Sequence, residues 1–267
     1  MKLNPPVLSD HPIDPAVRVR IMDELAAIER THDVKILYAC ESGSRGWGFA
    51  SPDSDYDVRF LYVHKLEWYL RVEPQRDVIE KPIDDELDVS GWEIRKALQL
   101  LHRSNPTLLE WLDSPVVYLA DEVHVRGLQD LARAFFAPIR GRYHYLSMGK
   151  KNFRGYLQGD EVRYKKYLYV LRPLLAVRWI DSGKGTPPMR FADLVAGTVA
   201  DAAVLAEINE LLALKMSAGE AELGPRRPAV HDFIETMLRE AEVEADYKRP
   251  EGDIAMLDGF LQRVALR

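Results

Sequence analysis

Apolar and polar residues in the first 120 positions follow two periodicities, one typical of helices and one typical of strands. Apolar residues recur at helical spacing over residues 15–30, with Asp14 as the expected N-cap and Pro15 in the first turn. Helical spacing returns from near Gly91 to Arg103 and, after a capping sequence at 104–106, as far as residue 112. Apolar runs predict strands at residues 34–40, 55–63, 77–80 and 87–90.

Strand patterns end near residue 120, and the remaining chain has helical spacing. Pro173 falls inside one expected helix and should bend it or end it near Arg172. We therefore expect an α/β domain at residues 10–115 and an all-α helical domain at residues 116–267. Within the second domain, separated by glycine and proline breaks, we expect helices at about residues 122–136, 141–157, 161–180, 201–216, 228–245 and 251–265.

Length and composition are those of an ordinary soluble globular protein. The chain has 267 residues, of which 47% are hydrophobic and 29% charged, which suits one or two cores. We expect no secretory signal and no membrane partner, because no basic segment precedes an apolar run and no apolar stretch approaches about 18 residues. Cys40 is the only cysteine, which excludes an intramolecular disulfide and favours a reducing cytoplasm.

A glycine-rich loop and three acidic residues form the pattern that points to chemistry. Gly43 and Ser44 follow a predicted buried strand, and the amides of such a loop can donate to phosphate oxygens. Asp55 and Asp57 are two residues apart on the next strand, so their carboxylates should share a face. Asp88 lies between apolar residues in a later strand. Carboxylates this close repel one another unless a cation lies between them, and Mg²⁺ or Mn²⁺ takes such oxygen ligands.

These residues resemble the signature of the polymerase-beta-type nucleotidyltransferase superfamily. That signature has a Gly-Ser pair, an Asp-x-Asp beginning eleven residues beyond Ser44, and a later lone Asp. More narrowly, the chain resembles the bacterial nucleotidyltransferases associated with RNA ligases and RNA repair. Three blocks between Tyr38 and Ile180 carry this resemblance: GSRGWGFASPDSDYDVRFLYV, DVSGWEIRKAL and KKYLYVLRPLLAVRWI. The resemblance implies an α+β fold, with a nucleotidyltransferase-type mixed sheet and helices followed by an all-α helical domain.

The resemblance also implies a reaction. An NTP such as ATP would be the donor, two Mg²⁺ or Mn²⁺ ions would take part, and a nucleoside monophosphate would move to an acceptor hydroxyl. Asp55 and Asp57 would bind both ions and Asp88 the ion that activates the acceptor, while Gly43 and Ser44 would hold the triphosphate. The implied acceptor is an RNA end, of tRNA or a single strand, in RNA repair or processing.

Other acceptors and another class of protein stay open. Nucleotidylation of a protein or of a small molecule would use the same carboxylates. A non-catalytic nucleotide-binding or antitoxin-like partner would use the same fold without the reaction. Three acids kept together favour an enzyme, because a binding module has no need of them.

The side chains around the acids each have a functional and a structural interpretation. Arg45 either contacts a phosphate or is simply exposed, and Trp47 stacks on a base or, more often in proteins, anchors a loop. Arg59 shares the face of the carboxylates and is expected to form ion pairs with them. Glu86 competes with Asp88 for the third position, and the apolar neighbours of Asp88 favour the latter.

The charge is spread unevenly along the chain. Net charge is −6 with a pI of about 5.7, which argues against a protein that coats nucleic acid by bulk charge. Residues 140–178 nevertheless hold ten Lys and Arg against two acids, which leaves a net charge of −14 elsewhere. A solvated cationic face is one interpretation of this basic region.

Two groups of side chains in the basic region are candidates for binding. Lys165, Tyr169 and Arg172 follow a helical i, i+4, i+7 spacing, so they share a face, and they are predicted to bind the nucleotide. In similar enzymes a helical-domain lysine closes over the triphosphate. The second group is predicted to follow an RNA backbone and consists of Lys150, Lys151 and Arg154.

Overall fold

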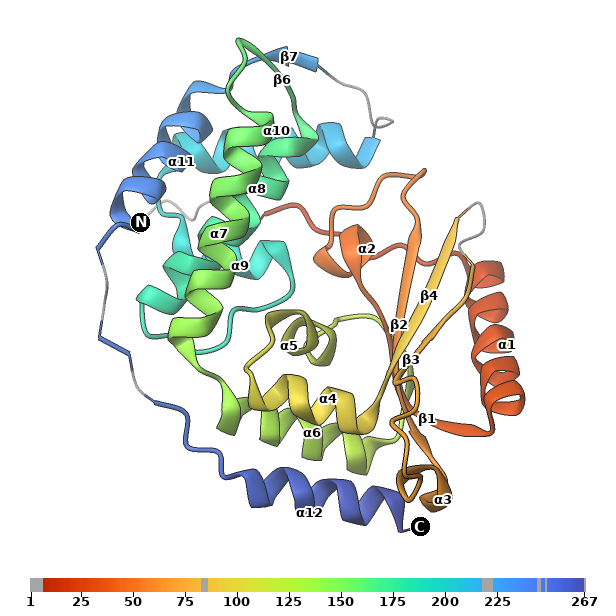
Figure 1. Cartoon of the computed structure of the whole chain (residues 1–267). Helices are drawn as coiled ribbons and strands as arrows, with labels where there is room; N and C mark the ends of the chain where they lie inside the picture. The colour runs from red at the N-terminus through yellow and green to blue at the C-terminus, as the bar shows by residue number, and fades with distance from the viewer. Residues whose placement is uncertain (1–6, 83–85, 218–222, 244–245, 248, 267) are drawn as a thin grey trace. The chain divides into compact units, whose positions relative to one another are not determined.

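The chain is arranged as two structural units, and one of them is built on a mixed β-sheet (Figure 1). The computed structural model describes residues 7–82, 86–217, 223–243, 246–247 and 249–266. We call the first the sheet unit, which consists of Pro12–Gly46, Asp55–Ala137 and Pro250–Arg267. We call the second the helical unit, which consists of Met1–His11, Trp47–Ser54 and Pro138–Arg249.

Five strands in the order β3-β4-β2-β1-β5 form the sheet. The β2 and β4 strands are parallel, and the other neighbours are antiparallel, so the sheet is mixed as expected. The strands are β1 (Val34–Glu41), β2 (Tyr56–His64), β3 (Val78–Glu80), β4 (Leu87–Glu93) and β5 (Val117–Ala120).

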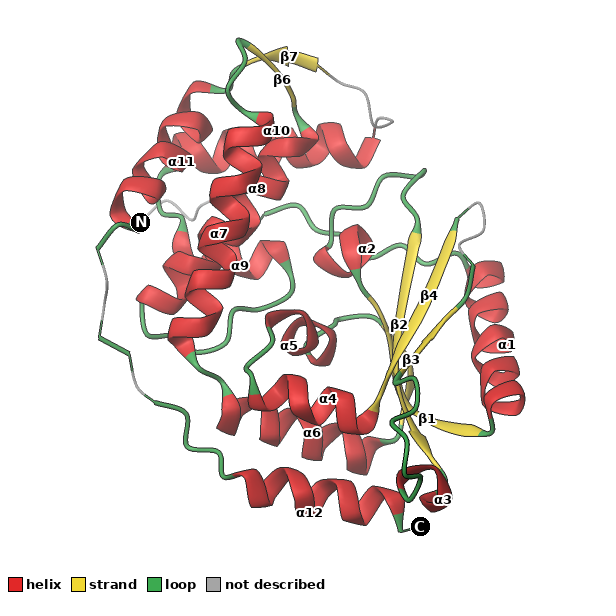
Figure 2. Cartoon of the chain, viewed as in Figure 1, coloured by secondary structure: helices red, strands yellow, loops and turns green. Residues whose placement is uncertain are grey.

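Helices cover both faces of the sheet (Figure 2). The α1 helix lies on one face, while α4 and α6 lie on the other, and α12 packs on α4 and α6. Asp14 caps α1 as predicted, since its carboxylate accepts from the Ala16 amide at 2.7 Å. The helices of this unit are α1 (Pro15–His32), α2 (Gly43–Trp47), α3 (Leu66–Tyr69), α4 (Ile94–His102), α5 (Pro106–Leu112), α6 (Glu122–Phe135) and α12 (Ile254–Ala265), of which α2 ends one residue beyond the unit.

The alternation of side chains along β2 decides which residues are available for chemistry. Val58 and Phe60 are fully buried and join a core cluster with Ile21 and Leu25 of α1. Burial of each such side chain contributes about 1.5–3 kcal/mol relative to exposure. Because side chains alternate along a strand, Asp57 and its neighbours of the same parity face away from α1.

Two sequence predictions in the sheet unit need correction. The helix expected from near Gly91 begins instead at Ile94, because β4 continues to Glu93 in parallel register with β2. Gly91 fits this strand since a Cβ there would collide with the Phe60 ring. The expected glycine-rich loop is the short helix α2, whose Gly46 amide donates to the Ser42 carbonyl at 3.2 Å.

Helices make up most of the helical unit. Strand structure does occur after residue 120, contrary to the sequence prediction, as the antiparallel pair β6 (Glu161–Arg163) and β7 (Leu223–Pro225). The pair was missed because three residues are too few for a detectable alternation. The helices are α7 (Pro138–Tyr156), α8 (Lys165–Asp181), α9 (Phe191–Thr198), α10 (Ala202–Ser217) and α11 (Pro228–Glu240). No described helix is long and apolar enough to cross a membrane.

The α8 helix passes through Pro173, so of the two expected outcomes, a bend or an end near Arg172, the end does not occur. A proline lacks the amide that would bond the carbonyl four residues earlier, here that of Tyr169. Asn152 of α7 supplies the missing donor, since its side-chain amide lies 3.0 Å from that carbonyl. The neighbouring helix therefore satisfies the group that the proline leaves unpaired.

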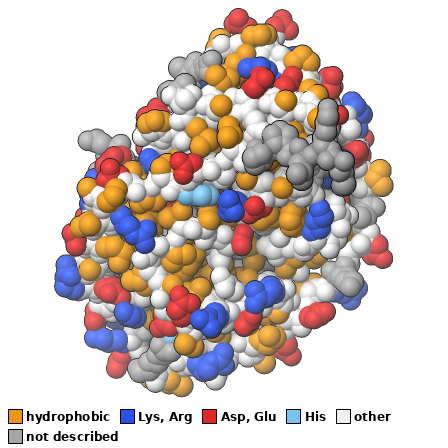
Figure 3. Space-filling model, turned by 180° about the vertical axis from the view of Figure 1, so that it is seen from behind, with side chains coloured by type: hydrophobic (Ala, Val, Ile, Leu, Met, Phe, Trp, Pro, Cys, Tyr) orange, Lys and Arg blue, Asp and Glu red, His pale blue; other side chains and the backbone are white. Residues whose placement is uncertain are grey.

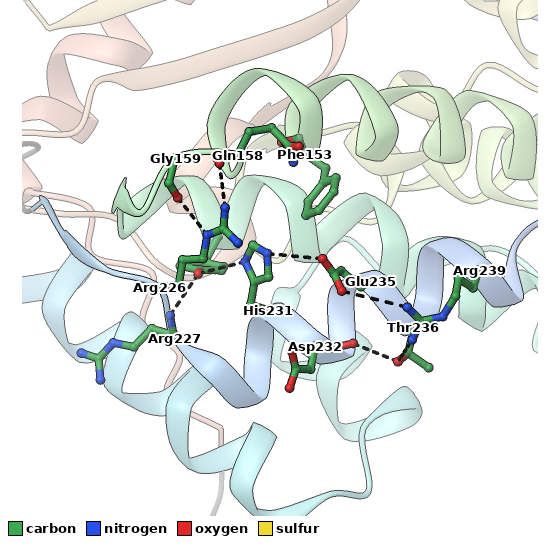
Figure 4. Close-up of polar contacts among 11 residues, drawn as sticks. Phe153, Gln158, Gly159, Arg226, Arg227, His231, Asp232, Glu235, Thr236 and Arg239 are labelled. Atoms are coloured by element: carbon green, nitrogen blue, oxygen red, sulfur yellow. Dashed lines mark hydrogen bonds and ion pairs between the residues drawn. The ribbon is translucent and has the colours of Figure 1, made fainter.

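Polar contacts fasten the segment between β7 and α11 to the turn before β6 (Figure 4). Arg226 donates to the Gln158 and Gly159 carbonyls at 2.6 and 2.8 Å. His231 of α11 lies 3.7 Å from Glu235 on the next turn of the same helix. These contacts are local to the helical unit and stabilise it rather than forming a site.

The division into units differs from the predicted boundary at 115/116 in two respects. The α12 helix, near the C-terminus, belongs to the sheet unit because its Leu257 and Phe260 side chains are buried where it packs on α4 and α6. Residues 47–54 belong to the helical unit, where the Phe49 ring meets Phe191 at 5.5 Å and Lys215 contacts Ser51. The segment that joins α2 to β2 is thus anchored outside the sheet unit.

Candidate active site

Asp57 and Asp88 are direct neighbours on adjacent strands. They pair in the parallel register of β2 and β4, each at the second position of its strand. Both side chains are half-buried, with 30% and 29% of their surface exposed. The structure therefore brings together two of the three predicted acids at the beginning of two parallel strands.

Arg59 binds both carboxylates, as the sequence predicted for an ion-pair partner. Its Nη2 atom lies 3.0 Å from Asp57 Oδ1 and 2.6 Å from Asp88 Oδ2. Its Nη1 atom donates to the Val58 and Asp88 carbonyls at 3.1 and 3.0 Å. One nitrogen thus touches both acids, which shows that a single small cationic group can reach both of them.

Asp55 lies immediately before β2 and is exposed, rather than on the strand as expected. It still acts on the site electrostatically. Burial raises the pKa of Asp57 above its usual range, and although Arg59 opposes this rise, Asp88 and Asp55 add to it. A cation near Asp57 would relieve this unfavourable burial of charge.

Gly43 lies directly against the Asp57 carboxylate. Its φ of +58° is in the left-handed region that favours glycine, and a Cβ there would collide with Asp57 Oδ2. The Ser42 amide donates to the Asp57 carbonyl at 2.8 Å, which fastens this turn to β2. The α2 helix begins with Gly43 and the partly buried Ser44, so the start of this helix lies beside the acid pair.

Sequence reasoning missed one acidic residue of this site, Glu41. It ends β1, its side chain is fully buried, and its Oε1 accepts from the Asp57 amide at 2.7 Å. Its Oε2 accepts from the Tyr118 hydroxyl. Burial raises the pKa of Glu41 to about 7, although both hydrogen bonds lower it. The detectable signal is a carboxylate that continues the apolar run of a buried strand.

Arg45 is not exposed, and its guanidinium contacts backbone carbonyls and an aromatic ring. Its side chain is buried, and it donates to the Asp55 and Pro12 carbonyls at 3.2 and 2.8 Å. The guanidinium also stacks on the Tyr56 ring at 3.8 Å. We therefore revise the predicted nucleotide contact: Arg45 holds the beginning of β2, where two of the acids lie.

Two residues of the predicted nucleotide-binding face of α8, Tyr169 and Arg172, contact Trp47. The Tyr169 ring meets Trp47 edge-on at 5.9 Å, and the buried Arg172 guanidinium lies 4.3 Å above the same ring. Trp47 thus anchors its segment within the helical unit, as the commoner interpretation predicted. Lys165, the first residue of α8, is partly exposed.

The basic region is divided between internal and surface positions. Arg142 is buried, pairs with Asp181 at 3.0 Å and donates to the Ala241 and Val243 carbonyls, so it connects helices. On the face shown in Figure 3, Lys and Arg side chains are interspersed with Asp and Glu. Three cationic side chains of α7 remain at least partly exposed, namely Lys150, Lys151 and Arg154.

The donor set suits Mg²⁺ when part of its coordination comes from a substrate. Among the residues that the structure describes, no three His, Cys, Asp or Glu side chains are arranged to hold an ion. Mg²⁺ is commonly held by one or two carboxylates together with substrate phosphates and water. Asp57 and Asp88 provide such a pair, since their oxygens converge on one nitrogen of Arg59.

Removal of Arg59 should make the protein depend on divalent ions for stability. We expect Arg59→Leu to lower the free energy of unfolding by about 2 kcal/mol without metal, because two half-buried carboxylates lose their counter-charge. Mg²⁺ or Mn²⁺ should then raise the melting temperature more in the variant than in the parent, since no guanidinium competes. Thermal melts of both proteins across a series of ion concentrations measure this difference.

Arg20→Leu is the matched control for this experiment. Arg20 pairs at 3.3 Å with Glu86, which is exposed and lies two residues before Asp88. Loss of this surface pair should cost at most about 1 kcal/mol and should leave the ion response of the parent unchanged. An equal ion response in Arg59→Leu and Arg20→Leu would contradict a cation site at the acid pair.

One family model matches most of the chain, and two known proteins are similar to it. The family described as RlaP, RNA repair pathway DNA polymerase beta family, matches residues 17–263. The chain is 50% identical over 222 residues to the uncharacterized protein YcgL of Bacillus subtilis (strain 168), which covers 83% of this chain and 85% of that protein. A solved nucleotidyltransferase-like protein from Exiguobacterium sibiricum 255-15 is 13% identical, with a TM-score of 0.29. This match covers 91% of the present chain and 75% of the solved chain.

Proposed function

Because the chain belongs to the RNA repair pathway DNA polymerase beta family, we propose that it moves a nucleoside monophosphate from an NTP to an acceptor hydroxyl. The observation that carries this proposal is the register pair of Asp57 and Asp88, with one cationic group touching both carboxylates. Two acids on adjacent strands, a third acid beside them and a Gly-Ser turn against one carboxylate supply the parts that such a reaction needs.

Asp57 and Asp88 would hold a divalent ion, with Asp55 as a further ligand for a second ion. Ions held there would supply charge neutralisation for the reacting phosphate and would lower the pKa of the acceptor hydroxyl. Gly43 and Ser44 would receive the triphosphate, because the turn approaches Asp57 as closely as a residue without a side chain allows. Beyond this, the protein needs to supply positioning rather than covalent chemistry.

Lys165 and Tyr169 of α8 remain candidates for contact with the nucleotide. Both side chains are partly exposed, whereas Arg172 is buried against Trp47. We therefore propose Lys165 as the cation for the triphosphate and keep Arg172 as a support for Trp47. Lys165→Ala should weaken NTP binding, measured by calorimetry, while Arg172→Ala should mainly lower the melting temperature.

We propose an RNA end as the acceptor, and the α7 cations provide its test. If Lys150, Lys151 and Arg154 each contact a phosphate, RNA binding releases counterions with a slope of about −0.7 per contact on a single strand. Alanine at all three positions should flatten the dependence of log affinity on log salt by about 2 and spare NTP binding. Fluorescence anisotropy with a labelled single-stranded RNA across a salt series measures this slope.

A second triple variant separates phosphate contact from net charge. Lys35, Lys65 and Arg126 are exposed cations of the sheet unit, and alanine at these positions changes the net charge equally. We expect this control to keep the salt slope of the parent within experimental error. If both triple variants change the slope equally, or if no RNA binds at low salt, the acceptor is a protein or a small molecule.

A transfer assay distinguishes an enzyme from a non-catalytic nucleotide-binding partner. Purified full-length protein should be incubated with each α-labelled NTP, Mg²⁺ or Mn²⁺, and either an RNA pool or lysate protein. Label should enter one acceptor class in the presence of ions and be absent with a chelator. NTP binding without any transfer would instead support the antitoxin-like or sensing alternative.

A further inference from the structure

A buried carboxyl group, that of Glu41, accepts a hydrogen bond from the backbone of a candidate metal ligand, Asp57. Glu41 is fully buried at the end of β1, directly after five buried apolar residues, 36–40. An ionisable group in such a position costs several kcal/mol unless its interactions compensate for lost hydration. A carboxyl group at this buried position therefore requires a specific role that offsets the cost of its burial.

The backbone of Glu41 is satisfied without its side chain. Its amide donates to the Val116 carbonyl at 2.9 Å, and its carbonyl accepts from the Ser114 hydroxyl at 2.6 Å. Strand pairing between β1 and β2 ends with Glu41 opposite Val58. An apolar side chain at this position would thus leave the strand intact, and the carboxylate must serve something other than the fold of β1.

Beyond the last residue pair of β1 and β2, the Glu41 carboxylate accepts the hydrogen bond that a strand carbonyl would otherwise accept. Asp57 lies one residue beyond the last strand pair, and its amide donates to Glu41 Oε1 at 2.7 Å instead of to a β1 carbonyl. The Tyr118 hydroxyl of β5 donates to the other oxygen and so fixes the orientation of the Glu41 carboxylate. Three adjacent strands are connected through this one side chain.

We propose that Glu41, oriented by Tyr118, is a positioning residue that fixes the backbone of Asp57 and thereby aims the Asp57 carboxylate at the divalent ion. This inference rests on the proposed function, because it assigns Glu41 a role in the metal site suggested there. Partners that orient a metal ligand typically change metal affinity by about 10–100-fold when they are removed. Glu41 acts through the ligand's backbone, so geometry rather than charge is what it supplies.

Three variants of the full chain separate this role from a merely structural one. Glu41→Leu removes the acceptor together with the buried charge, Glu41→Gln keeps an oxygen for the Asp57 amide, and Tyr118→Phe frees the carboxylate to turn. Mn²⁺ affinity is measured by calorimetry, and the melting temperature is measured without metal. We expect Glu41→Leu to melt at or above the parent's temperature and yet to bind Mn²⁺ at least about tenfold more weakly.

The conservative variants complete the test. Glu41→Gln should restore Mn²⁺ affinity to within about threefold of the parent, and Tyr118→Phe should fall between the two Glu41 variants. A folded Glu41→Leu that binds Mn²⁺ as the parent does would overturn the positioning role while leaving the proposed function intact. A parent protein that binds no Mn²⁺, with or without an NTP, would overturn both.

Discussion

Asp57→Asn should reduce nucleotidyl transfer by about a thousandfold or more while the protein stays folded. The substitution keeps the size of the side chain and removes the charge that would hold the ion against the reacting phosphate. A loss of about 4 kcal/mol of transition-state stabilisation, reasonable for a metal ligand, corresponds to this factor. Because burial raises the pKa of Asp57, the neutral amide is also tolerated in the folded state.

Glu86→Gln is the control that makes the Asp57 result specific. Glu86 is an exposed carboxylate directly before β4, the strand that carries Asp88. Its side chain forms an ion pair with Arg20. Its removal should change the transfer rate by no more than about twofold. Initial rates with α-labelled NTP under saturating Mg²⁺ compare the two variants. Comparable losses in both would show that bulk negative charge, and not a metal ligand, was removed.

Gly43→Ala should abolish transfer as well, for a steric reason. Alanine at φ +58° costs about 1 kcal/mol of backbone strain, and its Cβ would in addition collide with the Asp57 carboxylate. We expect the Asp57 carboxylate to be displaced from its position beside Asp88, which would remove the site for the ion. Both the transfer rate and the rise in melting temperature on adding Mn²⁺ should disappear.

Gly183 offers a matched control for the strain alone. Its φ is +70°, and a Cβ there would meet nothing within 4 Å. Gly183→Ala should therefore lower the free energy of unfolding by a similar amount, about 1 kcal/mol, through backbone strain. It should keep the Mn²⁺ response and the transfer rate of the parent. If Gly43→Ala behaves like Gly183→Ala in both assays, the close approach of the turn to Asp57 has no functional role.

Much of the sheet unit could be predicted from the sequence because its elements are long and regular. Continuous apolar runs identified the strands that carry Asp57 and Asp88, and Asp14 identified the beginning of α1. The ion pairs of Arg59 followed from the period-of-two geometry of a strand. What the local pattern cannot give is the register between strands, so the direct pairing of Asp57 with Asp88 needed the structure.

Three of the errors share a physical cause, which is contact with residues remote in the sequence. Pro173 does not end α8 because Asn152 on another helix supplies a donor. Arg45 is buried because carbonyl groups of residues 12 and 55 accept its hydrogen bonds. Glu41 escaped notice because its partners lie on two other strands. A single-residue interpretation cannot anticipate such partners, and they decide whether a charged side chain serves the fold or the site.

If the Asp57–Asp88 pair supports transfer of the nucleotidyl group of an NTP, a radiolabel on the α-phosphate should appear in the acceptor. Parent protein should be incubated with Mn²⁺ and an acceptor pool, once with α-³²P-labelled and once with γ-³²P-labelled NTP, for each of the four bases. We expect that only the α label enters the acceptor, that pyrophosphate is released, and that Asp57→Asn abolishes both. Transfer of the γ label, or α-label transfer that persists in Asp57→Asn, would contradict it.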